Sequence, residues 1–273
     1  MGQETGIPAL DWGAGRKLNW REEGSGPAML LVHGSPADGR AWNRVVPFLK
    51  DRFRLVMLDL LGYGGSDPVP DAPQGRAALM GSAIACLIES LAGSGGPVVV
   101  AGHSFGGLIA LEATLQAKPG AVSRLTMFKP MFMRGLSLVD DPVLAPVRAF
   151  FDAYVDRVDA GEPDSVGLMI DYWFGKGAFT RLPDPVRGYL NLNAPRNVLG
   201  VRSSFAAHMT ADQLGTLKMP VLMVWGDRSP EVIPAMGRAL QKLVPGARVE
   251  AIAGGNHGML DFHPEAVARY AAG

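Results

Sequence analysis

Cysteine is almost absent from this chain of 273 residues, in which Cys86 is the only one. An internal disulfide needs two cysteines, so stability must come from packing, which suits a reducing compartment. An excess of one charge is also absent, because 26 Lys and Arg residues balance 26 Asp and Glu residues. Without a basic field, the sequence has little to attract nucleic acid or anionic lipid. These absences indicate a small molecule as the partner.

Long hydrophobic runs and targeting signals are absent as well. No uninterrupted apolar stretch approaches 18 residues, so we expect no membrane span. The first fifteen residues lack the basic-then-apolar pattern of a signal peptide, and Gly6 stands where a myristoylation signal needs Ser or Thr. We therefore expect a soluble, cytoplasmic protein, and the sequence indicates no particular oligomeric state.

The most informative stretch that is present runs from Pro97 to Gly107, PVVVAGHSFGG. The apolar, β-branched Val98–Val100 are typical of a buried central strand, and the amphipathic LIALEATLQA that follows predicts a helix. Between them, Gly102, Ser104 and Gly106 spell G-x-S-x-G, in which the serine occupies a strained strand-to-helix turn. This pattern predicts that Ser104 is a nucleophile.

The rest of the chain alternates between apolar strands and amphipathic helices. We expect a parallel sheet covered on both faces, with strands at 29–32, 54–58, 98–100, 125–128, 221–225 and 248–253, and with helices at 41–50, 74–91 and 232–243. From 131 to about 212 the alternation stops, and helical segments broken by Pro and Gly follow one another. Aromatic residues of this region, among them Tyr172, Trp173 and Phe174, are candidates for lining a pocket.

These motifs together resemble the α/β-hydrolase fold superfamily over nearly the whole chain. The matching segments are HGSP at 33–36, DLLGYGGSD at 59–67, GHSFGG at 102–107, VLMVWGDRSP at 221–230 and GGNHG at 254–258. The resemblance implies an α/β fold with a doubly wound, mostly parallel sheet, whose core comprises residues 1–129 and 213–273. It also implies a helical cap at 130–212 and no cofactor or metal.

The resemblance further assigns roles around the nucleophile. His257, in a glycine-flanked loop after the last strand, would be the general base, and the backbone N–H groups of Ser35 and Phe105 would form the oxyanion hole. We expect His33 to be structural. Asp59 precedes the serine, which is the wrong order for this fold, so we expect it to hold its own glycine-rich loop together.

A carboxylate is missing from both positions where the family usually places the acid that orients His257. Ser229 occupies one position, and Lys129 occupies the other, where some relatives carry Glu before Pro. We predict that Asp227 completes the triad, with a turn-stabilising role as the alternative. Lys129 would either bind an anionic group of the substrate or lie outside the site.

The predicted function is hydrolysis of an ester, lactone or related acyl compound through an acyl-enzyme on Ser104, and we expect the substrate to be apolar. Hydrolysis of a C–C bond in a ring-cleavage product uses the same serine and histidine and is an alternative. The serine argues against a haloalkane dehalogenase or an epoxide hydrolase, because these enzymes need a carboxylate nucleophile at the position that Ser104 occupies in the strand-to-helix turn. A ligand-binding protein that kept the fold without turnover is a second alternative, because no carboxylate occupies either of the family's usual acid positions.

Overall fold

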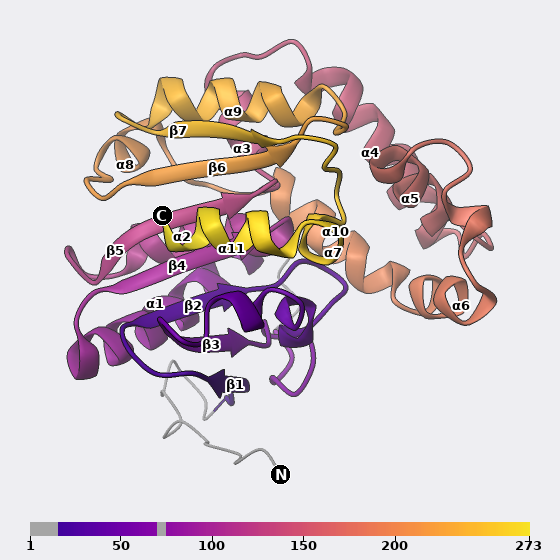
Figure 1. The fold of residues 1–273 in the computed structure, drawn as a ribbon. Helices are drawn as coiled ribbons and strands as arrows, with labels where there is room; N and C mark the ends of the chain where they lie inside the picture. The colour runs from indigo at the N-terminus through magenta and orange to yellow at the C-terminus, as the bar shows by residue number, and fades with distance from the viewer. Residues whose placement is uncertain (1–15, 70–74) are drawn as a thin grey trace.

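The computed structural model describes residues 16–69 and 75–273. Its centre is a seven-stranded sheet in the order β1-β3-β2-β4-β5-β6-β7 (Figure 1). Only β1 is antiparallel to its neighbour within this sheet, so the sheet is mostly parallel, as predicted. The strands are β1 (Trp20–Glu23), β2 (Ala28–Val32), β3 (Arg54–Leu58), β4 (Val98–His103), β5 (Val122–Phe128), β6 (Val221–Gly226) and β7 (Arg248–Ile252).

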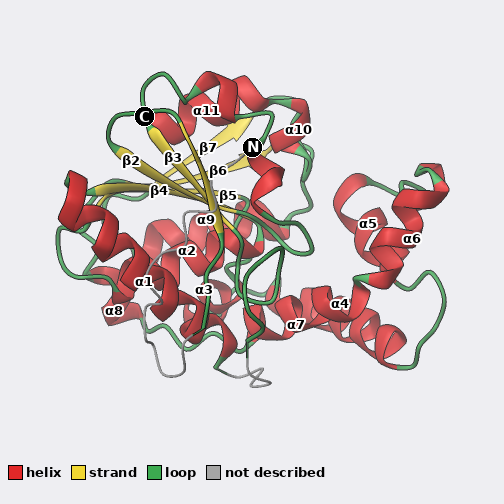
Figure 2. Ribbon diagram, turned by 90° about the horizontal axis from the view of Figure 1, so that it is seen from below, coloured by secondary structure: helices red, strands yellow, loops and turns green. Residues whose placement is uncertain are grey.

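Helices cover both faces of the sheet, which confirms the doubly wound fold. One face is covered by α1 (Arg76–Gly95), α2 (Phe105–Gln116) and α9 (Val232–Leu243), and the other by α10 (Met259–Phe262) and α11 (Pro264–Ala272) (Figure 2). Successive side chains of a strand point to opposite faces. Leu30 of β2 accordingly packs in the cluster that contains α1 and α2, whereas Leu31 packs in the cluster that contains α11.

Helix α1 is long and apolar enough to cross a membrane, judged by length and composition alone, although no uninterrupted apolar run had suggested it. Half of its most apolar window is buried, and the helix packs against α2. A buried core helix of a soluble protein passes the same test, so α1 is weak evidence for a span. The predicted start of this helix, Gln74, lies outside the described residues, and the helix continues past the predicted end to Gly95.

The helix predicted over 41–50 is replaced by two 3₁₀ helices, η1 (Gly39–Trp42) and η2 (Val46–Phe48). Pro47 lies in this stretch and has no N–H group to donate to an α-helical hydrogen bond. The apolar spacing nevertheless identifies the buried side correctly, because Trp42 and Leu49 are both buried.

A helical insertion connects β5 to β6, and we use this name for residues 133–215. It contains α3 (Met133–Leu138), α4 (Leu144–Asp159), α5 (Val166–Phe174), the 3₁₀ helix η3 (Phe179–Arg181), α6 (Asp184–Leu192), α7 (Ala194–Phe205) and α8 (Ala211–Gly215). Every residue of the insertion is described, and none is in a strand. Figures 1 and 2 show α5 and α6 as the part of the insertion farthest from the sheet.

Candidate active site

Ser104 lies between β4 and α2 with a φ of 54°, a left-handed conformation that non-glycine residues rarely adopt. The glycines on either side allow this turn to form. A Cβ atom on Gly106 would lie 2.1 Å from the His33 carbonyl oxygen, and one on Gly102 would lie 2.5 Å from the Gly106 carbonyl oxygen. The G-x-S-x-G spacing is therefore needed for close approach of strand, helix and loop, and it leaves Ser104 on the wall of a cavity.

The register of the sheet places Lys129 beside this serine. β4 and β5 are parallel neighbours, and their last residues, His103 and Phe128, are paired. Ser104 and Lys129 therefore follow directly after the ends of two adjacent strands. The Ser104 N–H donates to the Phe128 carbonyl at 2.9 Å, and the Met131 N–H donates to the Ser104 carbonyl at 3.2 Å. Both side chains therefore start from the carboxyl edge of the sheet, where open α/β sheets bind ligands.

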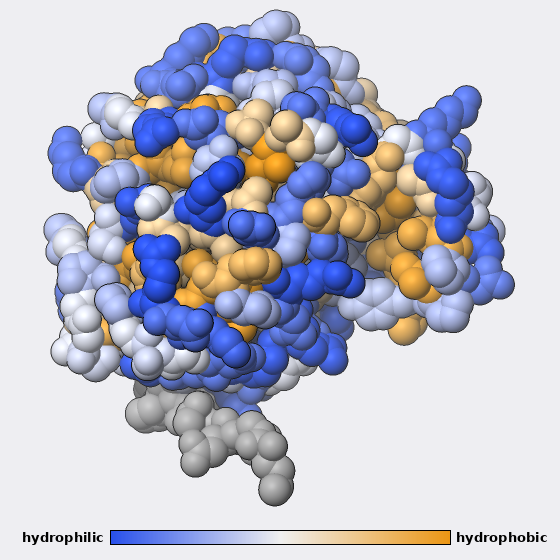
Figure 3. Space-filling view, viewed as in Figure 1, coloured by the Kyte–Doolittle hydropathy of each residue, from blue (hydrophilic) through white to orange (hydrophobic). Residues whose placement is uncertain are grey.

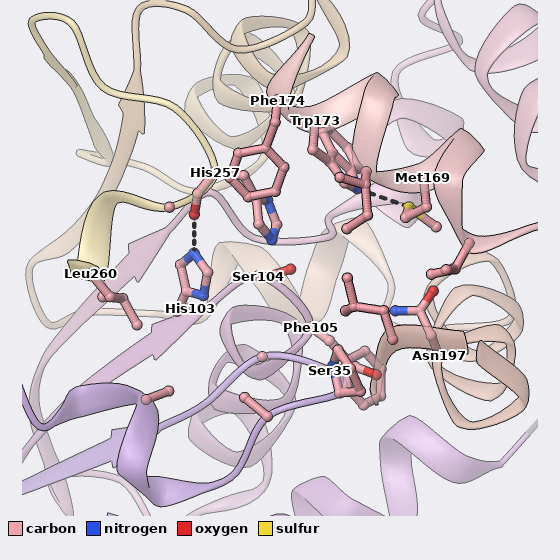
Figure 4. A pocket seen from close by; sticks show the side chains of 18 of the residues that line it. Ser35, His103, Ser104, Phe105, Met169, Trp173, Phe174, Asn197, His257 and Leu260 are labelled. Atoms are coloured by element: carbon pink, nitrogen blue, oxygen red, sulfur yellow. Dashed lines mark hydrogen bonds between the residues drawn. The ribbon is translucent and has the colours of Figure 1, made fainter. Parts of the chain in front are cut away.

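His257 follows β7, and its ring points toward Ser104 (Figure 4). Trp173 of α5 stacks on this ring with centroids 5.5 Å apart and planes inclined by 21°. Phe174 meets the ring edge-on with centroids 5.6 Å apart. The Nε2–H of His103 donates to the His257 carbonyl at 3.1 Å. Burial, and after it the charge of nearby Lys129, lower the pKa of His103 to about 3. The backbone and the ring of His257 are thus both held in place.

The partner of His257 Nδ1 is the Nζ atom of Lys129, at 2.5 Å. Lys129 has no exposed surface, and its Nζ lies 3.1 Å from the centroid of a Trp173 ring. Burial lowers the pKa of the Lys129 ammonium well below its usual value. The pKa of His257 is also well below its usual value, chiefly through burial and further through Lys129 and His103. No described salt bridge involves Lys129.

Asp227, predicted to orient His257, is engaged elsewhere. Its Oδ1 accepts the Gly254 N–H at 2.8 Å, and the residue is exposed. This hydrogen bond joins the loop after β6 to the loop after β7 that carries His257. Ser229, at one of the family's usual acid positions, has a buried Oγ without a hydrogen-bond partner in the described part of the chain.

Ser35 and Phe105, whose backbone N–H groups were predicted to form the oxyanion hole, both line the cavity with Ser104. Phe105 is the first residue of α2, where helical N–H groups have no intrahelical partner, and neither N–H group donates a hydrogen bond within residues 16–69 and 75–273. A Cβ atom on Gly34 would lie 3.0 Å from the Ser104 Cβ, so this glycine lets the loop that carries Ser35 approach the serine. Ser35 Oγ in turn accepts a hydrogen bond from the Tyr63 hydroxyl at 3.0 Å.

His33 and Asp59 have the structural roles that the sequence predicts. His33 is fully buried, and its Nε2 accepts the Leu60 N–H at 2.9 Å. The Asp59 carboxylate accepts the N–H groups of Gly39 and Gly65, each at 2.8 Å. Both side chains therefore fix loops beside the site.

The cavity over Ser104 has a volume of about 680 Å³ and lies between the sheet and the helical insertion. Its lining is mainly apolar and includes Met131, Val166, Met169, Ile170, Leu182, Leu190, Val201 and Leu260. Val186 and Phe262 line it and are also exposed, and Figure 3 shows apolar surface where the insertion meets the core. Arg181 and Asn197 are polar groups in the lining. Lys129 does not line the cavity, because it lies behind the His257 ring.

Within the described ranges, no group of three or more His, Cys, Asp or Glu side chains is placed to hold a metal ion. The arrangement at the cavity instead offers a hydroxyl, an imidazole and free N–H donors. These are the groups that nucleophilic acyl transfer requires.

The chain matches the model of the alpha/beta hydrolase family over residues 29–270. It belongs to the alpha/beta hydrolase family. Among curated proteins, it is 29% identical to the pimeloyl-[acyl-carrier protein] methyl ester esterase of Methylococcus capsulatus, covering 90% of this chain and 93% of that protein. Among solved structures, a bromoperoxidase from Bacillus anthracis has a TM-score of 0.74 at 20% identity, covering 99% of this chain and 100% of that one. The Exiguobacterium antarcticum esterase has a TM-score of 0.71 at 21% identity, with the same coverage.

One residue of this alpha/beta hydrolase's site, His103, was not predicted from the sequence. His103 directly precedes Ser104, which was a usable signal that it lies at the same edge. Trp173 was one of several aromatic candidates, and only the structure separates it and Phe174, which line the cavity, from Phe150 and Tyr172, which stack on each other with centroids 4.3 Å apart.

Proposed function

We propose that this alpha/beta hydrolase is a serine hydrolase that cleaves an ester, lactone or related acyl compound through an acyl-enzyme. The observation that carries the proposal is Ser104, held in a left-handed conformation at the cavity wall with the His257 ring pointing toward it. A hydroxyl alone is a weak nucleophile, and an adjacent base is what activates it.

The reaction begins when Ser104 Oγ attacks the substrate carbonyl and its proton passes to His257 Nε2. Negative charge then develops on the carbonyl oxygen, where the N–H groups of Ser35 and Phe105 stabilise it as fixed donors. The proton on Nε2 passes to the leaving group as the acyl-enzyme forms. A water molecule then attacks the acyl-enzyme in the same way, with His257 taking its proton and returning it to Ser104 Oγ as the acid is released. Ser104 and His257 thus return to their starting states.

The apolar lining favours a substrate with an apolar acyl group. Residues 130–212 would act as a cap over a core of residues 1–129 and 213–273, because α5, α6 and α7 supply much of the cavity wall. The similarity to an enzyme named as a methyl ester esterase supports ester hydrolysis in particular.

A panel of p-nitrophenyl esters of increasing acyl length tests the proposal, with Ser104→Ala as the control. We expect turnover by the wild type that disappears in the variant. Tight binding of small apolar molecules without any turnover would favour a ligand-binding protein. Turnover of a ring-cleavage product by an enzyme inert toward esters would move the assignment to C–C bond hydrolysis.

A further inference from the structure

Lys129 occupies the place behind His257 where a triad has its carboxylate. Its Nζ is 2.5 Å from His257 Nδ1 and 3.1 Å from the centroid of a Trp173 ring, and the side chain is wholly enclosed. Because Lys129 does not line the cavity, it is not placed to bind a group of the substrate. Any effect of Lys129 on the reaction must therefore pass through its contact with His257.

Two nitrogen atoms this close need a proton between them, and only two arrangements provide it. If Lys129 donates to Nδ1, the neutral imidazole carries its proton on Nε2 and cannot accept one from Ser104. If Nδ1–H donates to the lone pair of a neutral Lys129 amine, Nε2 is free to act as the base. The second arrangement is the one compatible with an activated serine.

We propose that Lys129 and His257 form a proton relay, in which the neutral amine of Lys129 is the final acceptor of the proton that Ser104 loses. This rests on the proposed serine hydrolase function. As Oγ bonds to the substrate carbonyl carbon, its proton moves to Nε2 while the Nδ1 proton moves to Nζ. The imidazole stays neutral with its proton on the opposite nitrogen, and Lys129 becomes an ammonium. When the leaving group takes the Nε2 proton, Nζ returns its own proton to Nδ1.

The surroundings of Lys129 suit a transient positive charge and not a permanent one. The titratable groups that face it are His257, from the loop after β7, and His103, from β4. Both become cations when protonated, and no carboxylate contributes to the shift of the Lys129 pKa. The face of Trp173, from α5, stabilises an ammonium when it forms. Burial lowers the pKa of the Lys129 ammonium well below its usual value, so a proton that the amine takes up is given back more readily.

The variant Lys129→Met removes the amine while keeping a side chain of similar length, with Lys218→Met at an exposed position as the matched control. We expect kcat to fall by about 10²–10⁴-fold, the usual contribution of proton transfer, with little change in KM. The ascending limb of kcat/KM against pH should move to lower pH, because only His257, whose pKa burial lowers, remains to take the proton. A limb that moves to higher pH would show that Lys129 is a permanent ammonium that repels the imidazolium, and an unchanged kcat would show a bystander.

The tautomer of His257 gives a readout that needs no substrate. In the full chain labelled with ¹⁵N-histidine, the His257 signals are assigned by their loss in His257→Gln. At neutral pH we expect a protonated Nδ1 and an unprotonated Nε2 in the wild type. A protonated Nε2 would overturn the relay while leaving the serine hydrolase assignment open to the ester assay. Ester turnover that persists in Ser104→Ala would instead overturn the serine hydrolase proposal, whatever the tautomer of His257.

Discussion

The ring nitrogen of His257 that a carboxylate would hold in a triad faces an amine in this protein. A carboxylate stabilises the imidazolium by its charge, whereas a neutral amine stabilises it only by accepting a hydrogen bond or the proton itself. The residue that decides the proton chemistry is therefore Lys129, and its identity separates this site from a Ser-His-Asp arrangement.

Replacing this amine by an acid tests that difference. In Lys129→Glu, a carboxylate near Nδ1 would raise the pKa of His257 by favouring the imidazolium. Because the base is active when neutral, the ascending limb of kcat/KM should lie at higher pH than in Lys129→Met, with activity restored relative to that variant. Profiles of the two variants that coincide would show that the new carboxylate does not reach the ring.

Asp227→Asn should have little effect on catalysis. The carboxylate accepts the Gly254 N–H, and an amide oxygen can still accept that hydrogen bond. We expect kcat to change by less than about tenfold, compared with the loss of about 10⁴-fold seen when a triad acid is neutralised. Steady-state kinetics on the best ester of the panel would measure it. A loss near the larger value would return Asp227 to the triad that the sequence predicts.

At the scale of elements, the strand-to-helix turn at Ser104 depends on how closely α2 approaches the loop after β2. In Gly106→Ala, the new methyl group would lie 2.1 Å from the His33 carbonyl oxygen, which forces the backbone apart. We expect a marked loss of thermal stability and of activity, since the Ser35 and Phe105 N–H groups would separate. Thermal unfolding followed by circular dichroism measures the first effect.

Gly188→Ala is the matched control for this substitution. Gly188 lies in α6, and no atom lies within 4 Å of the place that a Cβ atom would occupy, so the methyl group meets open space. Alanine is favoured over glycine inside a helix by roughly 0.5–1 kcal/mol, so stability should be kept or rise slightly. Equal losses in the two variants would show that the crowding at Gly106 is not what matters.

Local patterns account for the elements that sequence reasoning placed well. The strand, serine turn and helix around Ser104 lie within one continuous stretch, and β3 and α9 have the predicted bounds. The contact of Lys129 with His257 depends instead on the pairing of β4 with β5 and on the loop after β7, which no single stretch reveals. Register and packing between distant segments are tertiary properties, so the sequence identifies Lys129 and Ser229 at the usual acid positions but does not show that Lys129 is the one that contacts His257.

At the scale of the whole molecule, a buried amine makes stability depend on pH. The unfolded Lys129 has a pKa of about 10.4, and burial places the folded value well below it. Between these values the unfolded chain binds more protons, so the burial of Lys129 costs stability at neutral pH and the cost falls as pH rises toward about 10.4.

Lys129→Met should therefore unfold at a higher temperature than the wild type at pH 7. The difference should shrink as the pH is raised toward about 10, where the unfolded lysine also loses its proton. Calorimetry at several pH values measures both, with Lys218→Met as the exposed control. A difference that does not depend on pH would show that Lys129 has the same protonation state in the folded and unfolded chains.

The fold as a whole was predictable because its motifs extend from residue 33 to residue 258 in a fixed order. The cavity was not, because it depends on how α5, α6 and α7 lie over the sheet, and their sequences show only which residues are apolar. Of the aromatic candidates, those that line the cavity differ from those that pack within the insertion only by the direction in which they point.

The most direct test of Ser104 as the nucleophile is covalent labelling with a fluorophosphonate, followed by mass spectrometry of the digested protein. We expect one label per chain, on the peptide that contains Ser104, and none on Ser104→Ala. Lys129→Met should be labelled more slowly, because the same proton must leave the hydroxyl. A label on another residue, or an active enzyme that takes no label, would contradict the central claim that Ser104 is the nucleophile.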